Sequence, residues 1–455
     1  MNKNIELDCL KQKPLDLEKI FQDVQDPVDK EHIPHLTSQC LYCYDPPCVQ
    51  ACPTEIRIPE FIQRISTNNA VGAGEEILKE NPLGGTCGRV CPVESLCEKA
   101  CVKNKLGAAP VEIGRLQRYA VDQFFLSQQN PFKRESKSGK RVAVVGAGPA
   151  GLSCAFRLAL QGHQIVLFDK NEKLGGLNEY GIAPYKMVEQ WAQTEIDFIL
   201  KSGDIDIKPG VKLGTHISLA VLQEEFDAVF LSLGLENTNV LGLEHENIPG
   251  IYDAVDYISS IRQAEELSQI TVAKRVAVIG GGSTAIDIAS QMKKLGAEEV
   301  AIYYRRAKEN MGATLKEKQF VENQSIKIFA GFAPKKIYGN SQSGVQAIDF
   351  ARVEIRPSGA LWETGETLKV QADMVFKAIG QRLPSYIKKI SGIAGQKLKI
   401  SQGKIWVNAA RETSIKGVFA GGDCIGLGQD LTVYAVQDGK IAADSIEQQL
   451  KDRKD

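Results

Sequence analysis

The stretch that most constrains the fold is Lys140–Leu152, KRVAVVGAGPAGL, which lies about a third of the way along a chain of 455 residues. Arg141–Val145 has the β-branched composition of a buried parallel strand, and Leu152–Leu160 is expected to form a helix. Between them stands G-x-G-x-x-G, whose glycines are Gly146, Gly148 and Gly151. This order gives a tight turn, a close backbone approach to a pyrophosphate and a helix N-terminus facing its charge. It predicts a dinucleotide site without indicating which dinucleotide.

The residue that ends the next strand supports a cofactor role for this stretch. The apolar strand Gln164–Phe168 leads into Asp169, which stands 23 residues after Gly146. A carboxylate at that place can hold a ribose hydroxyl of a bound dinucleotide. Strand, helix and acid in register therefore favour a binding site over a merely structural glycine turn.

The same pattern returns 134 residues later, so this part of the chain is internally duplicated. A strand is expected over Lys274–Ile279 and a helix over Ile286–Leu295. The fingerprint positions between them are Gly280, Gly282 and Ala285. The next strand, Val300–Tyr304, ends in Arg305-Arg306 rather than in an acid. An arginine there accepts the 2′-phosphate of NADPH, whereas a carboxylate would bond the 2′-hydroxyl of NAD. The alternative is a solvated basic strand end.

Other segments carry glycines or acids that suit cofactor contacts. In LGGLNEYGIAPYK, the glycines beside Tyr180 let backbone approach a planar ring, although a plain turn also explains them. Phe226–Gly234 and Ala372–Gly380 echo each other as buried strands that run into glycine, which predicts a crossing back between domains. Val418–Asp423 is a strand ending in an acid. The helix over Leu431–Ile446 would present its positive end to a reduced, anionic flavin.

The cysteines indicate metal or redox use. Eight of the eleven lie within 62 residues, in a block C-x2-C-x4-C-x3-C and a block C-x3-C-x5-C-x3-C. The blocks are Cys40, Cys43, Cys48 and Cys52, then Cys87, Cys91, Cys97 and Cys101. Zinc sites prefer paired C-x2-C knuckles, and only Cys40 and Cys43 have that form. Three close cysteines and a fourth followed by Pro53 are typical of a bacterial ferredoxin run with one lengthened gap, which favours two [4Fe–4S] clusters over zinc.

The ferredoxin pattern also predicts crossed ligation, because the fourth cysteine of such a run ligates the other cluster. Cys52 would then leave the first three cysteines to find a fourth ligand in the second block. The segment Val111–Leu126 predicts an amphipathic helix with Gln117 in the middle of its apolar face. A buried amide needs a partner, and either a backbone hydrogen bond or a cluster would supply one.

Composition and charge narrow the class of protein. The chain is 43% hydrophobic and 24% charged with a net charge of −1, as in an ordinary soluble globular protein without nucleic-acid or anionic-membrane partners. The N-terminus MNKNIELDCL lacks the apolar core of a signal peptide, and no apolar run approaches the roughly 18 residues of a membrane span. We therefore expect a protein of the reducing cytoplasm.

The order of motifs resembles one family over nearly the whole chain. The cysteine blocks, GAGPAG, GGLNEYGI, GGGSTA with RR, and AGGD…LTVYAV are similar to the flavin and iron–sulfur electron-input subunits of NAD(P)H-dependent glutamate synthase and dihydropyrimidine dehydrogenase. CLYCYDPPCVQACPT, TCGRVCP and IGRLQRYA resemble the dehydrogenase branch more, including Cys87, where glutamate synthase small subunits usually lack a cysteine. The resemblance implies an α/β fold with two Rossmann-like dinucleotide-binding domains. The nicotinamide domain would be inserted in the FAD domain, and an α-helical double [4Fe–4S] domain would precede both.

The resemblance implies a ligand set for each cluster. One cluster would take Cys40, Cys43, Cys48 and Cys101. The other would take Cys52, Cys91, Cys97 and the glutamine matching Gln117, with Cys87 as a bystander. Cys87 as the fourth ligand is the chemically simpler alternative and stays open.

The resemblance also implies domain bounds and cofactor contacts. The domains would be 1–138 for the clusters, 139–250 and 380–455 for FAD, and 251–379 for NAD(P)H. The candidate cofactor-binding residues are Gly146, Gly148, Pro149, Ala150, Gly151, Asp169, Lys170, Gly176, Leu177, Tyr180, Gly181, Gly234, Gly280, Gly282, Ser283, Thr284, Arg305, Arg306, Ala378, Gly380, Gly422, Asp423, Leu431, Thr432 and Val433.

The expected activity is electron input, with no catalytic side chain assigned because the cofactors carry the chemistry. Hydride from NADPH or NADH would reduce FAD, and single electrons would pass through the two [4Fe–4S] clusters. The resemblance implies an FMN-bearing barrel subunit as partner, which would reduce uracil or thymine, because the chain ends at Asp455 without such a domain. The alternatives are a glutamate synthase small subunit and a non-catalytic redox sensor or assembly scaffold.

Overall fold

The computed structural model describes residues 20–356 and 359–452. The chain divides into two compact units. Unit 1 contains residues 237–382, the short segment Tyr180–Val188 and the described residues up to Asp23. Unit 2 contains the stretches 24–179, 189–236 and 383–455, apart from the residues outside the described range. Unit 1 is thus contributed mainly by one long insertion into the sequence of unit 2.

Unit 2 begins with a layer of helices that carries both cysteine blocks. The helices are α2 (Ile33–Ser38), α3 (Pro47–Gln50), α4 (Ile58–Ser66), α5 (Ala70–Glu80), α6 (Gly84–Val90) and α7 (Ile113–Leu126). Helix α7 begins two residues later than the helix predicted over 111–126. Its apolar face is buried as predicted, since Leu116, Ala120 and Val121 are fully buried. Helices α5 and α6 each pack on α7.

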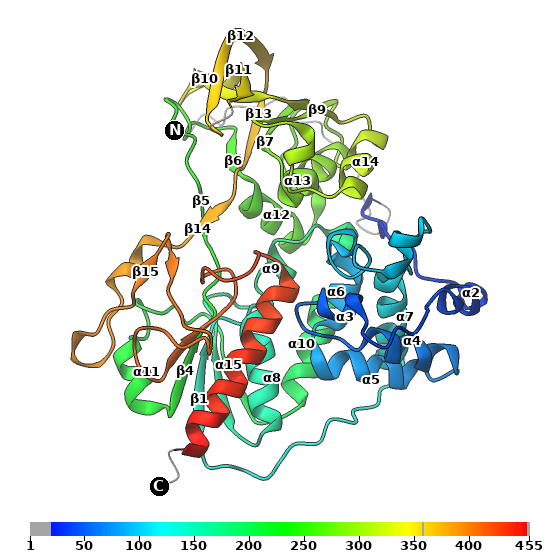
Figure 1. Ribbon diagram of the computed structural model, residues 1–455. Helices are drawn as coiled ribbons and strands as arrows, with labels where there is room; N and C mark the ends of the chain where they lie inside the picture. Colours follow the sequence, from blue (N-terminus) through cyan, green and yellow to red (C-terminus); the bar gives the residue numbers. More distant parts are fainter. Residues whose placement is uncertain (1–19, 357–358, 453–455) are drawn as a thin grey trace. The chain divides into compact units, whose positions relative to one another are not determined.

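The rest of unit 2 is a doubly wound parallel sheet in the order β17-β4-β1-β2-β3. Its strands are β1 (Arg141–Val145), β2 (Gln164–Phe168), β3 (Ile205–Lys208), β4 (Ala228–Leu231) and β17 (Val418–Ala420), with a small ribbon of β15 (Ile400–Ser401) and β16 (Lys404–Ile405). Its helices are α8 (Pro149–Leu160), α9 (Leu177–Tyr180), α10 (Trp191–Lys201), α11 (Leu219–Glu225) and α15 (Thr432–Asp452). In Figure 1, α15 runs beside α8, to which it is packed.

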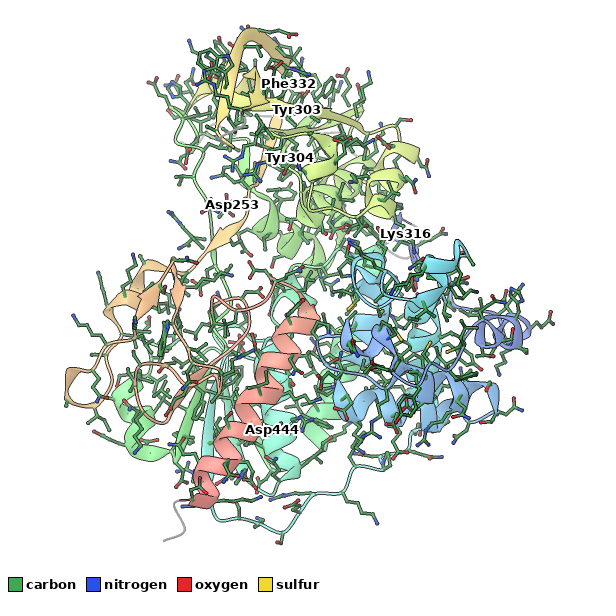
Figure 2. The ribbon with its side chains drawn as sticks, in the orientation of Figure 1. Asp253, Tyr303, Tyr304, Lys316, Phe332 and Asp444 are labelled. Carbon is green, nitrogen blue, oxygen red and sulfur yellow. The ribbon has the colours of Figure 1, made fainter. Side chains whose placement is uncertain are left out.

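The packing of α15 on α8 is close and partly charged. A Cβ on Gly439 would collide with the carbonyl oxygen of Ala150, so the two backbones touch there. At the other end of the contact, Arg157 pairs with Asp444 at 3.3 Å. Asp444 is labelled on α15 in Figure 2. The contact places the last helix of the chain against the first glycine-rich turn.

Unit 1 repeats the parallel sheet, here in the order β6-β13-β7-β8-β9. These strands are β6 (Ile251–Asp253), β7 (Arg275–Gly280), β8 (Glu299–Tyr304), β9 (Lys327–Ala330) and β13 (Met374–Ala378), with helices α12 (Ala254–Gln263), α13 (Ser283–Lys294) and α14 (Leu315–Asn323). The two similar strand sequences occupy equivalent places in the two sheets, because β4 pairs with β1 in unit 2 as β13 pairs with β7 in unit 1.

Unit 1 also holds an antiparallel sheet of β10 (Phe332–Asn340), β11 (Gly344–Ile355) and β12 (Leu361–Gln371). The sequence predicts strands over Val345–Ile355 and Leu368–Val370, which correspond to nearly all of β11 and to a part of β12. Stacked rings join the two sheets: Tyr303 lies 4.0 Å from Phe350 and 5.1 Å from Phe329 between ring centroids. Figure 2 shows Tyr303 and Phe332 close together in this part of the unit.

Short elements complete the description. The strands β5 (Asn237–Thr238) and β14 (Gln381–Arg382) pair with each other at the ends of the insertion. The 3-10 helices are η1 (Lys30–His32), η2 (Val93–Ser95), η3 (Val102–Leu106), η4 (Pro184–Lys186), η5 (Leu267–Gln269), η6 (Lys308–Asn310), η7 (Ser385–Lys389) and η8 (Ile393–Gly395). Among the described helices, none combines the length and apolarity needed to cross a bilayer.

One buried carboxylate joins the helical layer to the parallel-sheet part of unit 2. Glu195 of α10 is fully buried and accepts the backbone N–H groups of Gly85 (2.7 Å) and Thr86 (3.1 Å) at the start of α6, and the Thr86 hydroxyl also donates to it. Beside it, the Arg89 guanidinium lies 3.6 Å from the centroid of the Trp191 ring. Burial raises the pKa of Glu195 to about 7, against the opposing effect of its hydrogen bonds.

This raised pKa gives a testable pH dependence of stability. Between pH 4.5 and about 7 the folded protein keeps a proton on Glu195 that the unfolded chain has lost. The contribution of Glu195 to the free energy of unfolding is therefore full below pH 4.5 and falls as the pH rises, by at most about 1.4 kcal/mol per pH unit. We expect Glu195→Gln to remove this slope in denaturant unfolding followed at pH 5, 6, 7 and 8. If the free energy of unfolding depended on pH equally in the variant and in the parent, Glu195 would not be the group with the raised pKa.

Candidate functional site

The first glycine turn is shaped by contacts that leave no room for side chains. Gly146 has φ +102°, and a Cβ there would strike the carbonyl oxygen of Ser232 after β4. A Cβ on Gly151 would strike the carbonyl of Gly146 itself. Gly148 differs, since it is the N-cap of α8 and nothing stands within 3.9 Å of its missing Cβ. Pro149 follows at the first helical position. The turn thus keeps the helix N-terminus open to an anion.

The carboxylate of Asp169 braces this turn. It is 6% exposed and accepts the backbone N–H of Ala147 at 2.7 Å and that of Asn171 at 2.8 Å. Burial raises its pKa, and the two hydrogen bonds oppose that shift. Lys170 points elsewhere, to Glu236 at 2.6 Å. Asp169 therefore shapes the glycine turn directly, a role that the sequence pattern did not reveal.

Three segments distant in sequence converge on the turn. Gly176 approaches so closely that its Cβ would stand 2.8 Å from the Cα of Gly148, and Leu177 follows it as the first residue of α9. A Cβ on Gly422, after β17, would lie 3.2 Å from that of Ala150. The Thr432 hydroxyl at the start of α15 donates to Asn178 at 3.0 Å.

Some predicted residues lie at the edge of this convergence. Leu431 immediately precedes α15, and Val433 is buried within it. Gly234, with φ +61°, follows β4 and faces open space. Asp423 is deeply set, and burial, assisted by Asp430, raises the pKa of its carboxyl to about 6. A hydroxyl group of a bound cofactor could donate a hydrogen bond to this carboxyl and so stabilise its charged form.

The sequence did not predict the pair of charged residues, Asp438 and Arg411, that holds the backbone at Gly422. Asp438 of α15 accepts the N–H of Gly422 at 2.9 Å and the Arg411 Nε at 2.7 Å. Burial raises the pKa of Asp438, and Arg411 opposes the shift. No motif marks this pair, because its members stand 27 residues apart in a helix and a turn.

The second glycine turn repeats the geometry of the first within unit 1. Gly280 has φ +153°, and its Cβ would strike the carbonyl of Ala378, as that of Gly146 would strike Ser232. Gly282 is the N-cap of α13 and faces open space; Ser283 and Thr284 follow as the first helical residues. Gly380, with φ +84°, accepts the backbone N–H of Asn239 at 2.9 Å with its carbonyl oxygen. Arg305 and Arg306 come directly after β8 and are exposed, and the described residues offer neither an ion-pair partner.

A buried charge cluster supports this second turn. Lys186 of η4 pairs with Asp287 of α13 at 2.7 Å and with Glu317 of α14 at 2.8 Å. Glu317 also accepts the Ser283 hydroxyl at 3.1 Å and closes a capping box with Thr314. The segment Tyr180–Val188 belongs to unit 1. Tyr180 and Gly181 therefore lie in a different unit from Gly176 and Leu177, which belong to unit 2. Only the T-x-x-E spacing of the capping box was visible in the sequence.

The first group of cysteines lines one cavity in the helical layer. Cys40, Cys43, Cys48 and Cys101 surround it together with apolar side chains of Ile58, Ile62 and Val111. Burial raises the pKa of Cys48 to about 12, and the neighbouring Cys40 adds to the shift. Tyr42 adopts φ +49°, and its backbone N–H faces the Cys40 thiol. The set is the one that crossed ligation predicts, and these thiols fit a [4Fe–4S] cluster.

The remaining cysteines form a second group. Cys91 is hydrogen-bonded to Cys87 and lies near Cys52 and Cys97. The hydrogen bond with Cys87, together with burial and the neighbouring thiols, raises the pKa of Cys91 well above its usual value. Gln117 donates from Nε2 to the Gly84 carbonyl at 2.7 Å, at the start of α6, so a backbone partner is present. Asn81 donates to the Cys87 sulfur at 3.2 Å.

The described cysteines are all free thiols. No three His, Cys, Asp or Glu side chains in residues 20–356 and 359–452 stand close enough to hold a single ion. A [4Fe–4S] cluster asks for wider spacing, since each of its four ligands binds a different iron. Two separate groups of thiols in a largely apolar layer suit this kind of centre.

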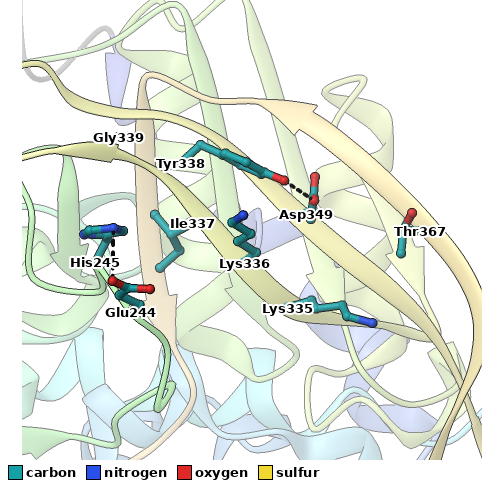
Figure 3. A pocket seen from close by; sticks show the side chains of 9 residues that line it. All are labelled: Glu244, His245, Lys335, Lys336, Ile337, Tyr338, Gly339, Asp349 and Thr367. Carbon is teal, nitrogen blue, oxygen red and sulfur yellow. Dashed lines mark hydrogen bonds and ion pairs between the residues drawn. The ribbon is translucent and has the colours of Figure 1, made fainter.

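A further pocket of about 440 Å³ lies on the antiparallel sheet of unit 1 and contains none of the predicted residues. Figure 3 shows the Tyr338 hydroxyl bonded to Asp349 (2.6 Å) and His245 beside Glu244 (3.7 Å). Lys335, which also lines it, pairs with Glu363 at 2.6 Å. Lys336 lies over the Tyr338 ring, 4.9 Å from its centroid. Such mutual contacts of polar groups are typical of a polar sheet surface.

Comparison with known proteins identifies the family. Residues 140–439 match the family described as pyridine nucleotide-disulphide oxidoreductase, and residues 17–129 match dihydropyrimidine dehydrogenase domain II with its 4Fe–4S cluster. The chain belongs to the pyridine nucleotide-disulphide oxidoreductase family. It is an NAD(P)H-dependent flavin and iron–sulfur oxidoreductase subunit, which confirms the predicted fold class, enzyme class and cofactors.

Two curated relatives of this oxidoreductase are almost equally similar. The glutamate synthase [NADPH] small chain of Escherichia coli (strain K12) is 32% identical over 95% of both chains. The NAD-dependent dihydropyrimidine dehydrogenase subunit PreT homolog of Salmonella typhi is 33% identical over 91% of this chain and 94% of that one. Among solved structures, FprA of Mycobacterium tuberculosis in complex with NADPH superimposes with a TM-score of 0.58 at 18% identity, covering 69% of this chain and 85% of that one, a likeness of fold.

Iron content tests which residue completes the second thiol group of this oxidoreductase. Two loaded [4Fe–4S] clusters correspond to about eight iron atoms per chain. We expect Cys87→Ser to keep about eight, because Gln117 is the predicted eighth ligand. The matched variant Cys91→Ser should fall toward about four when iron is measured per folded chain. A fall to about four in Cys87→Ser would make Cys87 the ligand.

Proposed function

We propose that this chain is the electron-input subunit of a dihydropyrimidine dehydrogenase, with an FMN-bearing barrel subunit as its partner. The observation that carries the proposal is the grouping of eight cysteines beside a dinucleotide fold in one compact unit. The similarity to the PreT proteins and the second-block Cys87 support the dehydrogenase branch. A glutamate synthase small chain is the second candidate, supported by a relative of equal identity.

The cofactors are proposed at the two glycine turns. FAD is assigned to the turn of Gly146–Gly151 with Gly176, Gly422 and Thr432 around it, and the nicotinamide coenzyme to the turn of Gly280–Gly282. The predicted domain bounds at 138, 250 and 379 are retained as part of this proposal. When bound, the flavin converts the two electrons of a hydride into single electrons for the clusters. The chain itself supplies backbone N–H groups toward pyrophosphate and the partly buried Asp423 carboxyl toward a hydroxyl.

Purification with candidate partners tests the function. With an FMN-bearing barrel subunit, the complex should oxidise NADH or NADPH only when uracil or thymine is added. Alone, the chain should reduce dyes, and NAD(P)H should bleach its flavin absorbance. Oxidation that depends on glutamine and 2-oxoglutarate with a glutaminase-bearing subunit would replace the proposal by the glutamate synthase candidate. Absence of bleaching would indicate a sensor or scaffold.

The coenzyme preference rests on the arginine pair after β8. Arg305 and Arg306 are exposed, and neither is held by an acid within the described residues, so both are available to a 2′-phosphate. We expect Arg305→Ala combined with Arg306→Ala to raise the KM for NADPH at least about tenfold, the loss of roughly one charge-assisted hydrogen bond. The KM for NADH should change little. An unchanged KM for NADPH would show that the pair lies outside the site.

A further inference from the structure

The loop between Cys40 and Cys48 turns its large apolar side chains toward solvent. Leu41 is 56% exposed and Tyr42 43%, while Tyr44 has the full exposure of an extended chain, 103%. Leu106, at the end of η3, is 73% exposed. We call these four residues the rim patch. Exposed apolar groups gathered on adjoining loops mark interaction surfaces more often than scattered ones do.

The rim patch lies on the two segments that carry the first thiol group. Leu41 lines the cavity of Cys40, Cys43, Cys48 and Cys101, and so do Val102 and Lys103 of η3, which ends at Leu106. Leu41, Tyr42 and Tyr44 directly adjoin Cys40 and Cys43 in sequence. A molecule seated on the patch would therefore stand next to the thiols, with only one layer of loop between them.

The surroundings of the patch are mainly basic. Lys99 and Lys105 flank Cys101 on the exposed surface, and no acid pairs with either of them within the described residues. Lys103 is bonded to Gln39 at 2.5 Å. The acid of the same loop, Asp45, accepts the Gln50 amide at 2.6 Å. An apolar centre with uncompensated lysines beside it complements a surface with an apolar centre and an acidic rim.

We propose that the rim patch is the docking surface for a one-electron acceptor protein whose redox centre lies beneath an apolar surface with an acidic rim. The inference rests on the proposed function, because it takes the first thiol group to hold the exit cluster. Each encounter transfers one electron to the oxidised centre of the partner, and no bond is made or broken. A small patch suits this use, since redox encounters are brief and bury less surface than stable complexes.

Binding of a small acidic bacterial ferredoxin to the purified holoprotein tests the proposal. We expect Leu41→Ser combined with Tyr44→Ser to weaken the ferredoxin Kd about tenfold or more, as for central apolar contacts. Lys99→Gln combined with Lys105→Gln should weaken it at low salt and flatten its salt dependence. Trp362→Ser, which removes a 52% exposed aromatic from β12 in unit 1, is the matched control and should leave the Kd unchanged. A basic c-type cytochrome should bind more weakly than the ferredoxin.

Three outcomes would overturn the docking surface. One is an unchanged Kd in both patch variants, and another is equal or tighter binding of the basic cytochrome. The third is a self-associated chain that the apolar variants convert to monomer, which would make the occupant a second copy. Iron content and flavin bleaching by NAD(P)H are measured on the same preparations. If bleaching or iron is absent in the parent, the proposed function fails instead, whatever the Kd values show.

Discussion

Glu195 holds together the part of the molecule on which electron transfer depends. Its carboxylate is fully buried and satisfies the N–H groups of Gly85 and Thr86, which would otherwise be unpaired donors at the start of α6. Helix α6 leads into Cys91, and α10, which carries Glu195, packs against α8 of the first glycine turn. One side chain thus fixes the position of a thiol group relative to the dinucleotide fold. Packing of Phe124 and Phe156 against Phe198 supplies the apolar part of the same junction.

The two glycine turns have the same steric arrangement of their first and second glycines. In each, the first glycine adopts positive φ against a carbonyl of the neighbouring strand, and the second faces open space as a helix N-cap. The supports differ. Asp169 braces the first turn from within, whereas Lys186, from a segment far away in sequence, braces the second through Asp287 and Glu317.

The first thiol group and the rim patch lie on the same two segments of the helical layer. Four of the eight cysteines of the helical layer are buried and the other four are partly buried. Burial raises the pKa of Cys40, Cys48 and Cys97, and the hydrogen bond with Cys87 together with burial raises that of Cys91, so these thiols are stable only as neutral groups or as ligands. At the first group, Leu41 of the covering loop lines the thiol cavity while remaining half exposed, and Tyr42 and Tyr44 are exposed to solvent. The same loop therefore carries the proposed ligands and the proposed docking surface.

The sequence by itself determined the fold class and both glycine turns. These rest on local rules, because strand composition and glycine spacing leave few alternatives. The ferredoxin run predicted crossed ligation of the first thiol group, and the family resemblance, rather than any spacing, implied Cys101 as its fourth member. Only the tertiary structure decided the roles of Glu195, Lys186 and Asp438, because each acts on backbone or charge brought near by folding and no spacing marks it. It also decided that Tyr180 lies in a different unit from Gly176, and that Leu41 and Tyr44 face solvent, since exposure depends on what packs above a loop.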